Sequence, residues 1–353
     1  MDGYWVLGSE EELISRKGKG LLSKRGIYFP SFYLSKINYN KSMAKIGYIQ
    51  VTRDCNQKCI ICSNPPNNRG LSFEKAKKEV DELKSKGYGQ VILTGGEPTL
   101  YKKLPDLIKY CLKKKIFPRI ITNGQKIADL NYLKILKKAG LQHLHLSVYS
   151  YRDDVQSKIS QNKNSLKNIK KALNNLEKIG GITVDINAAI SKYNANHLFK
   201  TVSWLVEKHP FVKHFVFNNL DPFMNRASEN PQVIPRLNDF ELELHKALEM
   251  LEKNEKTFRV ERVPLCYLTD FERVSTETRK IVKNENRTIY FLDQRGKLTQ
   301  EDWYYKKADY CRYCFLNKIC AGLYAMGKYY DEKELYPVFV NPQKTIDKIL
   351  KNQ

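Results

Sequence analysis

Three cysteines at the end of a predicted strand constrain this sequence more than any other feature. Residues 46–52 alternate in side-chain character, which predicts a β-strand. The strand runs into Cys55, Cys59 and Cys62, spaced C-x3-C-x2-C. Three thiolates on one short loop can hold three corners of an iron–sulfur cluster and leave the fourth iron open to a small molecule. A zinc loop or a structural iron–sulfur site is the alternative, but zinc favours a fourth Cys or His at close spacing, and none follows before Cys111.

The next predicted strands also end in small or polar residues. A strand over 90–94 runs into Gly-Gly-Glu-Pro at 95–98. A strand over 119–122 ends in Asn-Gly, and one over 143–148 carries a serine near its end. Glycines permit close backbone approach, and polar side chains at strand ends can cap the strand or contact a ligand. The sequence therefore predicts a ligand site at one edge of a sheet.

Together, residues 46–222 resemble the radical S-adenosylmethionine (radical SAM) superfamily. In that family, a strand-end cysteine triplet binds a [4Fe–4S] cluster whose open iron chelates the amino and carboxylate groups of S-adenosylmethionine. The resemblance implies this role for Cys55, Cys59 and Cys62. It also implies reductive cleavage of the cofactor to a 5′-deoxyadenosyl radical that abstracts a substrate hydrogen. An external electron donor such as flavodoxin or ferredoxin is then expected.

The resemblance extends to contacts with the cofactor. Glu97 is expected to accept a hydrogen bond from the cofactor's ammonium group, and Ser147 to bind ribose hydroxyls, with Asn187 as a weaker second candidate. Taken singly, each polar residue at a strand end is more often a cap than a ligand. The remaining expected cofactor-binding positions are Gly95, Gly96, Pro98 and the backbone of Ile61.

Strands that alternate with helices predict parallel βαβ units. Six such units match the partial (β/α)6 barrel of the resembled family, so the fold class is α/β: a partial TIM-like barrel with a small C-terminal iron–sulfur cap, made of a β-hairpin plus helices. Helical spacing places Cys111 on a buried stripe, as a packing residue. The expected divisions are an N-terminal extension (1–45), the barrel (46–222), a linker helix with a twitch-like auxiliary-cluster domain (223–330) and a C-terminal tail helix (331–353).

Further elements are predicted from periodicity and turn residues. A short helix is expected over 10–15 and a hairpin over 288–298. The later strands are expected at 182–190 and 214–218, and the later helices at 195–208, 237–255 and 345–351.

A second cysteine group lies near the C-terminal end of the sequence. Cys311, Cys314 and Cys320 follow a C-x2-C-x5-C pattern that resembles the auxiliary-cluster segment of SPASM and twitch-type radical enzymes. A full SPASM segment has a further cysteine where this chain has Tyr324. With Cys266, the group can ligate one auxiliary [4Fe–4S] cluster; a four-cysteine zinc site is the alternative. Cys266 could instead be a free thiol that donates a hydrogen atom to a substrate radical.

The chain carries a formal charge of +23, from 61 Lys and Arg against 38 Asp and Glu. Such a charge attracts nucleic acid, acidic peptides or acidic membranes, although the lysines are spread over most predicted helices, as on solvated faces. No apolar run approaches the ~20 residues of a membrane span, and no signal-peptide pattern opens the sequence. We expect a cytoplasmic protein, in which eight cysteines favour metal binding over disulfides.

The leading functional hypothesis is a radical SAM oxidoreductase that matures a ribosomally made, acidic peptide or protein by crosslinking, epimerisation or oxidation. Asp221, just past the sixth strand, is placed to act as a substrate-contacting acid or base, or else to cap the following turn. The charge favours an RNA-modifying enzyme as an alternative, but the sequence has no aromatic-rich RNA-binding motif. A small-molecule enzyme and a non-catalytic iron–sulfur or zinc scaffold complete the alternatives.

Overall fold

The structure is a computed structural model that describes residues 5–7, 13–17, 20–22, 28–30, 45–223 and 225–351. The chain divides into two compact units, residues 1–41 and 42–353. The first contains an antiparallel sheet in the order β1-β2-β3-β4, formed by Trp5–Leu7, Leu13–Lys17, Gly20–Leu22 and Tyr28–Pro30. The helix expected over 10–15 is wrong for its second half, which lies in β2; residues 10–12 are outside the described residues.

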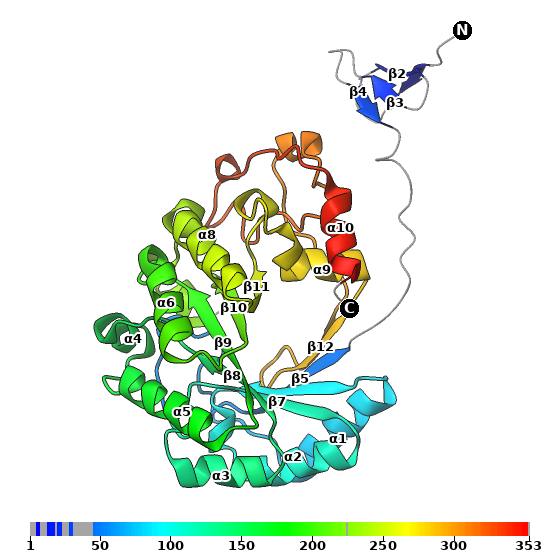
Figure 1. Ribbon diagram of the computed structural model, residues 1–353. Coiled ribbons are helices and arrows are strands. Elements are labelled where there is room, and N and C mark those ends of the chain that lie inside the picture. Colours follow the sequence, from blue (N-terminus) through cyan, green and yellow to red (C-terminus); the bar gives the residue numbers. More distant parts are fainter. Residues whose placement is uncertain are drawn as a thin grey trace. The chain divides into compact units, whose positions relative to one another are not determined.

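The second unit is organised on one open sheet in the order β11-β10-β9-β8-β7-β6-β5-β12-β13. Every neighbouring pair from β11 to β12 is parallel, and β13 alone is antiparallel to its neighbour. Figure 1 shows the sheet curving, with α1, α2, α3 and α5 on its outer side. The strands are Ile46–Thr52 (β5), Gln90–Gly95 (β6), Phe117–Thr122 (β7), His143–Ser147 (β8), Thr183–Ile190 (β9), His214–Asn219 (β10), Thr257–Glu261 (β11), Arg287–Tyr290 (β12) and Lys297–Gln300 (β13).

The helices connect successive strands and cover the sheet through apolar stripes. In α2, Leu104, Leu107, Ile108 and Cys111 are buried at the predicted helical spacing, so Cys111 does serve packing. In α1, the Ser72 side chain accepts a hydrogen bond from the Lys75 backbone N–H and so caps the helix N-terminus. The helices are Phe73–Ser85 (α1), Leu104–Lys113 (α2), Leu130–Lys138 (α3), Asp153–Ser160 (α4), Ser165–Ile179 (α5), Leu198–Lys208 (α6), Asn225–Glu229 (α7), Leu237–Lys253 (α8), Thr276–Lys283 (α9) and Pro342–Lys351 (α10).

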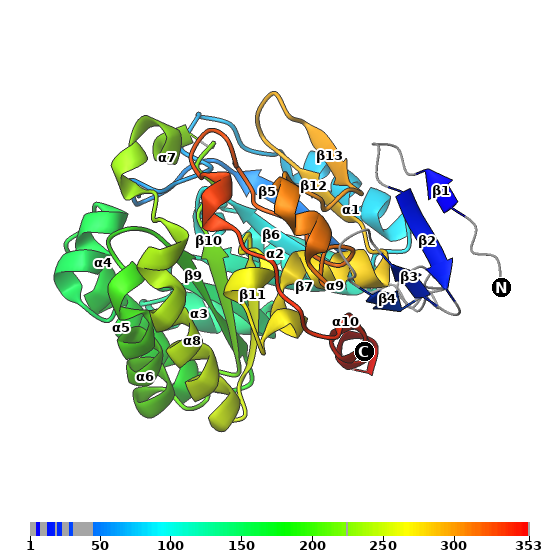
Figure 2. The ribbon, with the colours of Figure 1, turned by 90° about the horizontal axis from the view of Figure 1, so that it is seen from above.

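The partial barrel predicted from the alternating pattern is confirmed, and the structure adds two parallel strands, β11 and β12, to the six predicted ones. Strand β11 pairs with β10 and was not predicted. The predicted hairpin forms as β12 and β13, but it continues the barrel sheet through β5 and does not stand apart in a cap. Figure 2 shows β12 beside β5, with β13 on its far side. No helix of the described residues is both long and apolar enough to span a membrane.

Candidate active site

The cysteine triplet opens onto a cavity of about 380 Å³ inside the barrel. Cys55, Cys59 and Cys62 follow β5 directly and line this cavity together. Each of the eight parallel strands also supplies lining residues, among them Tyr48 of β5 and Glu261 of β11. In parallel α/β sheets, ligands bind where the carboxyl ends of the strands meet. The cavity therefore brings the cysteine loop and the strand ends into one site.

The Gly-Gly-Glu-Pro segment holds the cysteine loop by backbone contact. The Gly96 backbone N–H donates to the Thr52 carbonyl at 2.8 Å, and the Glu97 N–H donates to the Asp54 carbonyl at 2.7 Å. A Cβ on Gly95 would lie 2.0 Å from the Thr52 carbonyl oxygen, and Gly95 has φ +134°. The close approach expected at these glycines is thus made to the chain that carries the cluster cysteines.

The Glu97 side chain is fully buried and links two strand ends to this loop. Its Oε1 accepts hydrogen bonds from the Thr99 hydroxyl at 2.6 Å and the Thr122 hydroxyl at 2.8 Å. Its Oε2 accepts from the Asn123 backbone N–H at 2.7 Å. Burial raises the pKa of Glu97 despite these donors. Glu97 is one of the residues that line the cavity, and its Oε2 accepts only one of these hydrogen bonds.

Hydrogen bonds to sulfur prepare the loop for metal binding. Cys55 Sγ accepts from the Gln57 N–H at 3.4 Å and from the Asn123 amide at 3.8 Å, and Cys62 Sγ accepts from the Asn64 N–H at 3.3 Å. Burial raises the pKa of Cys55 to about 11 and that of Cys59 to about 12. Metal binding must therefore remove the thiol protons. Three thiols, two of them with N–H donors, and no fourth Cys or His on the loop fit a cluster with one open iron.

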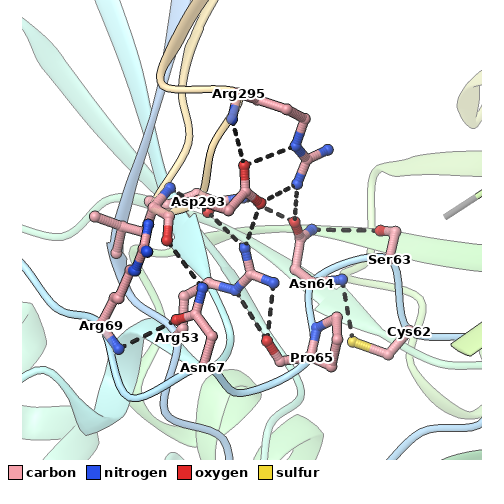
Figure 3. A network of polar contacts seen from close by, with 11 residues as sticks. Arg53, Cys62, Ser63, Asn64, Pro65, Asn67, Arg69, Asp293 and Arg295 are labelled. Carbon is pink, nitrogen blue, oxygen red and sulfur yellow. Dashed lines mark hydrogen bonds and ion pairs between the residues drawn. The ribbon is translucent and has the colours of Figure 1, made fainter. Parts of the chain in front are cut away.

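A buried arginine ties the loop to the β12–β13 turn, as Figure 3 shows. The Arg53 guanidinium donates to the Pro65 carbonyl at 2.8 and 3.1 Å and forms an ion pair with Asp293 at 2.9 Å. Arg295 also pairs with Asp293, and it donates to the Asn64 side chain at 3.4 Å. This ion pair joins two segments that are far apart in the sequence. A partner 240 positions away leaves no local signal.

The remaining expected cofactor residues lie around the same cavity. Ser147, at the end of β8, and Asn187, on β9, both line it, and Asn187 Oδ1 accepts a hydrogen bond from the Asn218 amide at 2.6 Å. Ile61 lines the cavity and packs in a buried apolar cluster with Val155. Pro98 is buried at the start of a single 3-10 turn, outside the lining. Their roles toward the cofactor stay predictions.

Tyr149 is a neighbour of the cysteines that sequence reasoning missed. It follows β8, lines the cavity, and hydrogen-bonds Cys59. Burial and the nearby cysteines raise the pKa of Tyr149 well above its usual value, so the hydroxyl keeps its proton. A tyrosine two residues after a predicted strand-end serine is a weak signal, because aromatic side chains there usually serve packing.

The second cysteine group converges in space. Cys266, Cys311, Cys314 and Cys320 line one small cavity together with Lys307. Backbone N–H groups donate to two of these sulfurs at 3.3 Å, from Gly322 to Cys320 and from Val338 to Cys314. The described cysteines form no disulfide. Four thiols around one cavity fit either a [4Fe–4S] cluster or a tetrahedral zinc ion.

Asp221 lies outside the lining of the main cavity. Its carboxylate accepts hydrogen bonds from the Tyr324 hydroxyl at 3.0 and 3.1 Å, and from the Phe223 backbone N–H at 3.1 Å. The last bond is the turn-capping arrangement weighed as the alternative. The role of Asp221 as an acid or base toward substrate stays a prediction.

His143, His145 and Asp185 form a polar cluster in the barrel interior. Asp185 Oδ2 lies 2.8 Å from His143 Nε2 and 3.4 Å from His145 Nδ1. The two imidazole rings are stacked, with 5.2 Å between centroids and 15° between planes. Ring-nitrogen lone pairs lie in the ring plane, so parallel stacked rings do not direct them at one ion. We interpret the cluster as two stacked histidines beside one carboxylate, which hydrogen-bonds His143.

A partial barrel with a cysteine triplet at the end of its first strand defines an iron–sulfur enzyme fold. Residues 49–205 match the family model described as Radical SAM superfamily. This match confirms the predicted resemblance to the radical SAM superfamily, and the cysteine triplet and the Gly-Gly-Glu-Pro segment both lie within the matched residues.

Two curated relatives resemble parts of the chain. The 7,8-dihydro-6-hydroxymethylpterin dimethyltransferase of Methanocaldococcus jannaschii is 27% identical over 277 residues, which cover 73% of this chain and 53% of that protein. The PqqA peptide cyclase of Granulibacter bethesdensis is 33% identical over 102 residues, covering 28% of this chain and 27% of the cyclase. The chain thus spans about half of the first relative and about a quarter of the second.

Solved structures share the fold. Streptococcus suis SuiB bound to the precursor peptide SuiA aligns with a TM-score of 0.56 and 19% identity, covering 70% of this chain and 58% of that one. The anSMEcpe enzyme with bound AdoMet and the Cp18Cys peptide aligns with a TM-score of 0.58 and 17% identity, covering 87% and 96%. These likenesses confirm the open α/β barrel.

Proposed function

We propose that this chain is a radical SAM peptide maturase: it cleaves S-adenosylmethionine reductively and abstracts a hydrogen atom from a residue of a ribosomally made peptide or protein. The observation that carries the proposal is the shared cavity. It joins the cysteine triplet to Ser147, Asn187 and a charged wall at Glu261, so a cofactor and a substrate residue fit in one enclosure.

The chain's own residues would perform distinct tasks. Cys55, Cys59 and Cys62 would hold a [4Fe–4S] cluster, which supplies the electron for cofactor cleavage when a flavodoxin or ferredoxin reduces it. Glu97 would bind the cofactor's ammonium group, and Ser147 its ribose. The hydrogen bonds that anchor Glu97 fix its carboxylate before the cofactor arrives.

A peptide substrate has support from several of the similar proteins. One relative is a peptide cyclase, and two proteins of the same fold were solved with peptides bound. The net charge of +23 favours an acidic peptide. The alternative is a small-molecule enzyme, which the pterin methyltransferase relative favours.

We further propose that Cys266, Cys311, Cys314 and Cys320 hold one auxiliary [4Fe–4S] cluster, in a segment related to the twitch type. Their convergence on one cavity supports a ligand role for Cys266 over a free hydrogen-donating thiol. Tyr324 stands where a full SPASM segment has a cysteine, so one auxiliary cluster is expected.

Cofactor cleavage tests the main proposal. The anaerobically reconstituted, reduced chain should convert S-adenosylmethionine to 5′-deoxyadenosine. The Cys55→Ala, Cys59→Ala, Cys62→Ala triple variant should lose this activity, because the open iron is gone. Cys111→Ala is the matched control, since that thiol packs in α2. Undiminished cleavage by the triple variant would contradict the assignment.

Iron content tests the auxiliary site. The reconstituted chain should bind about eight irons, and the triple variant about four. One zinc and no iron in the triple variant would show a structural zinc site. A Cys266→Ala variant that keeps all its iron but makes no product would give Cys266 the hydrogen-donor role.

A further inference from the structure

Two arginines contact a single glutamate at the gap between the two ends of the open barrel sheet. Strand β11 is one edge of the sheet, while β12 lies next to the other edge. Arg287 of β12 nevertheless reaches Glu261 of β11, with 3.2 Å between its Nη2 and Glu261 Oε1. Arg262 follows β11, and its Nη1 lies 4.0 Å from Glu261 Oε2. All three residues line the cavity that contains the cysteine triplet.

Both guanidinium groups are held in place before any ligand binds. Arg287 lies between two aromatic rings, 5.3 Å from the centroid of Tyr48 and 5.0 Å from that of Trp303. Arg262 Nε donates to the Asn219 carbonyl at 2.7 Å. The backbone of Arg262 has φ +58°, a conformation that is costly for a residue with a side chain and that often marks a functional position. The fold thus fixes the direction of both side chains.

The hydrogen bonds within the described chain use few of the available donors. An arginine carries five N–H donors. Arg287 spends one on Glu261, and Arg262 spends one on Asn219. The remaining donors of both side chains belong to residues that line the cavity. Such a pair of pre-oriented forks matches the two oxygens of a carboxylate.

The charges of the lining residues also favour an anionic ligand. The lining contributed by this corner has two guanidinium groups and one carboxylate, an excess of one positive charge. A second carboxylate, Glu277, is buried nearby and accepts a hydrogen bond from the Arg262 backbone N–H at 2.9 Å. Burial, and then the charge of Glu261, raise the pKa of Glu277 to about 7, so it is only partly charged near neutral pH. Asp221 also acts on Arg262 from outside the lining, so the positive excess is confined to the side chains that line the cavity.

We infer that Arg262 and Arg287 form a subsite for a carboxylate of the substrate, carried by an acidic residue of the peptide. The inference rests on the proposed function and deepens it: a glutamate or aspartate near the reacting residue would anchor the peptide in the cavity. Glu261 orients both arginines and, as their only carboxylate partner in the lining, weakens their hold on an incoming anion.

Two tripeptides with uncharged ends provide the test: acetyl-Gly-Glu-Gly-amide and acetyl-Gly-Gln-Gly-amide. They differ in charge but hardly in shape. Binding to the reconstituted full chain in the presence of S-adenosylmethionine is measured by calorimetry. The wild-type chain should bind the glutamate peptide at least tenfold more tightly. Arg262→Gln and Arg287→Gln should each remove most of that preference.

Two further variants separate a local subsite from general charge or misfolding. Arg152→Gln removes an exposed arginine that is paired only with Asp154, and it should leave the preference unchanged. Glu261→Gln should increase the preference several-fold, because it frees both guanidinium groups. This opposite sign keeps the inference testable even if both arginine variants fail to fold.

Cofactor cleavage, measured on the same samples, separates this inference from the proposed function. Equal binding of the two peptides by a chain that cleaves S-adenosylmethionine would overturn the subsite and leave the radical function standing. Loss of the preference in Arg152→Gln would overturn it as well. So would pyrophosphate binding that depends on Arg262 and Arg287 without any peptide preference, since it would assign the corner to a phosphate group.

Discussion

Gly95 shows how one missing side chain can hold a functional loop. The residue has φ +134°, and its Cα faces the Thr52 carbonyl so closely that a Cβ would lie 2.0 Å away. The atoms in the way belong to backbone, which cannot rotate aside. The tight contact places the chain leading to Cys55 against the end of β6. Gly95 therefore positions the cysteine loop, independently of any contact that it makes with the cofactor.

We therefore expect Gly95→Ala to reduce the free energy of unfolding by about 3 kcal/mol or more, from backbone strain and overlap together. Chemical denaturation of the cluster-free chain measures this. Gly89→Ala is the matched control, because a Cβ there meets nothing within 4 Å and φ is ordinary. Equal unfolding midpoints for the two variants would contradict the close-contact argument.

The burial of His145 makes the free energy of unfolding depend on pH in the acidic range. Burial lowers the pKa of His145 to about 4, while an unfolded histidine titrates near 6.5. Between these values the unfolded chain binds more protons, so the free energy of unfolding falls as pH falls from about 6.5 to 4. One such histidine contributes a slope of up to about 1.4 kcal/mol per pH unit.

We expect His145→Gln to flatten part of this slope. The measurement is urea unfolding of the wild-type and variant chains at pH 7.5, 6 and 5, each compared with its own value at pH 7.5. Burial likewise lowers the pKa of His214 to about 4, so some slope should persist in the variant. Parallel curves for the two chains would show that His145 is not buried in its neutral form.

At the scale of elements, the β12–β13 hairpin belongs to the active-site scaffold. Its turn carries Asp293, whose carboxylate pairs with Arg53 at 2.9 Å and with Arg295. The hydrogen bonds from Arg295 and Arg53 hold the pKa of Asp293 well below its usual range. The Arg53 side chain is only 3% exposed, so removal of its partner leaves a buried charge uncompensated.

Asp293→Asn should therefore destabilise the chain by about 3 kcal/mol or more. It should also change the electron paramagnetic resonance spectrum of the reduced cluster, because Arg295 and Asn64 connect Asp293 to the Cys62 sulfur. Asp154→Asn is the matched control: it too breaks an arginine pair, but a surface one, for which about 0–1 kcal/mol is expected. An unchanged spectrum in Asp293→Asn would limit the hairpin to a structural role.

At the scale of the whole molecule, the elements predicted correctly are those marked by a regular spacing of apolar residues within one short segment. Strand β5 appears at 46–52 as predicted, and the buried stripe of α2 follows the predicted spacing. The strand missed by sequence reasoning, β11, has only five residues, and two of them, Arg259 and Glu261, are charged. Its buried Phe258 and Val260 do alternate with polar residues, but two apolar positions in five residues are too weak a pattern to mark a strand.

The same division holds for the site. A cysteine triplet and a glycine pair are signals that fit in one short window, and the structure places them around one cavity. The Arg262–Glu261–Arg287 corner and the Arg53–Asp293 pair join segments distant in sequence. No sequence spacing marks the residues of either contact, so only the three-dimensional structure reveals them.

The sequence separation of Arg53 and Asp293 also determines when, during synthesis, their ion pair can form. A ribosome adds about 5–20 residues per second, so Asp293 follows Arg53, 240 residues later, by roughly 12 to 48 seconds. During that interval the nascent chain already carries the three cysteines but not the carboxylate that locks their loop. Cluster insertion into the locked loop can therefore take place only after residue 293 has been synthesised.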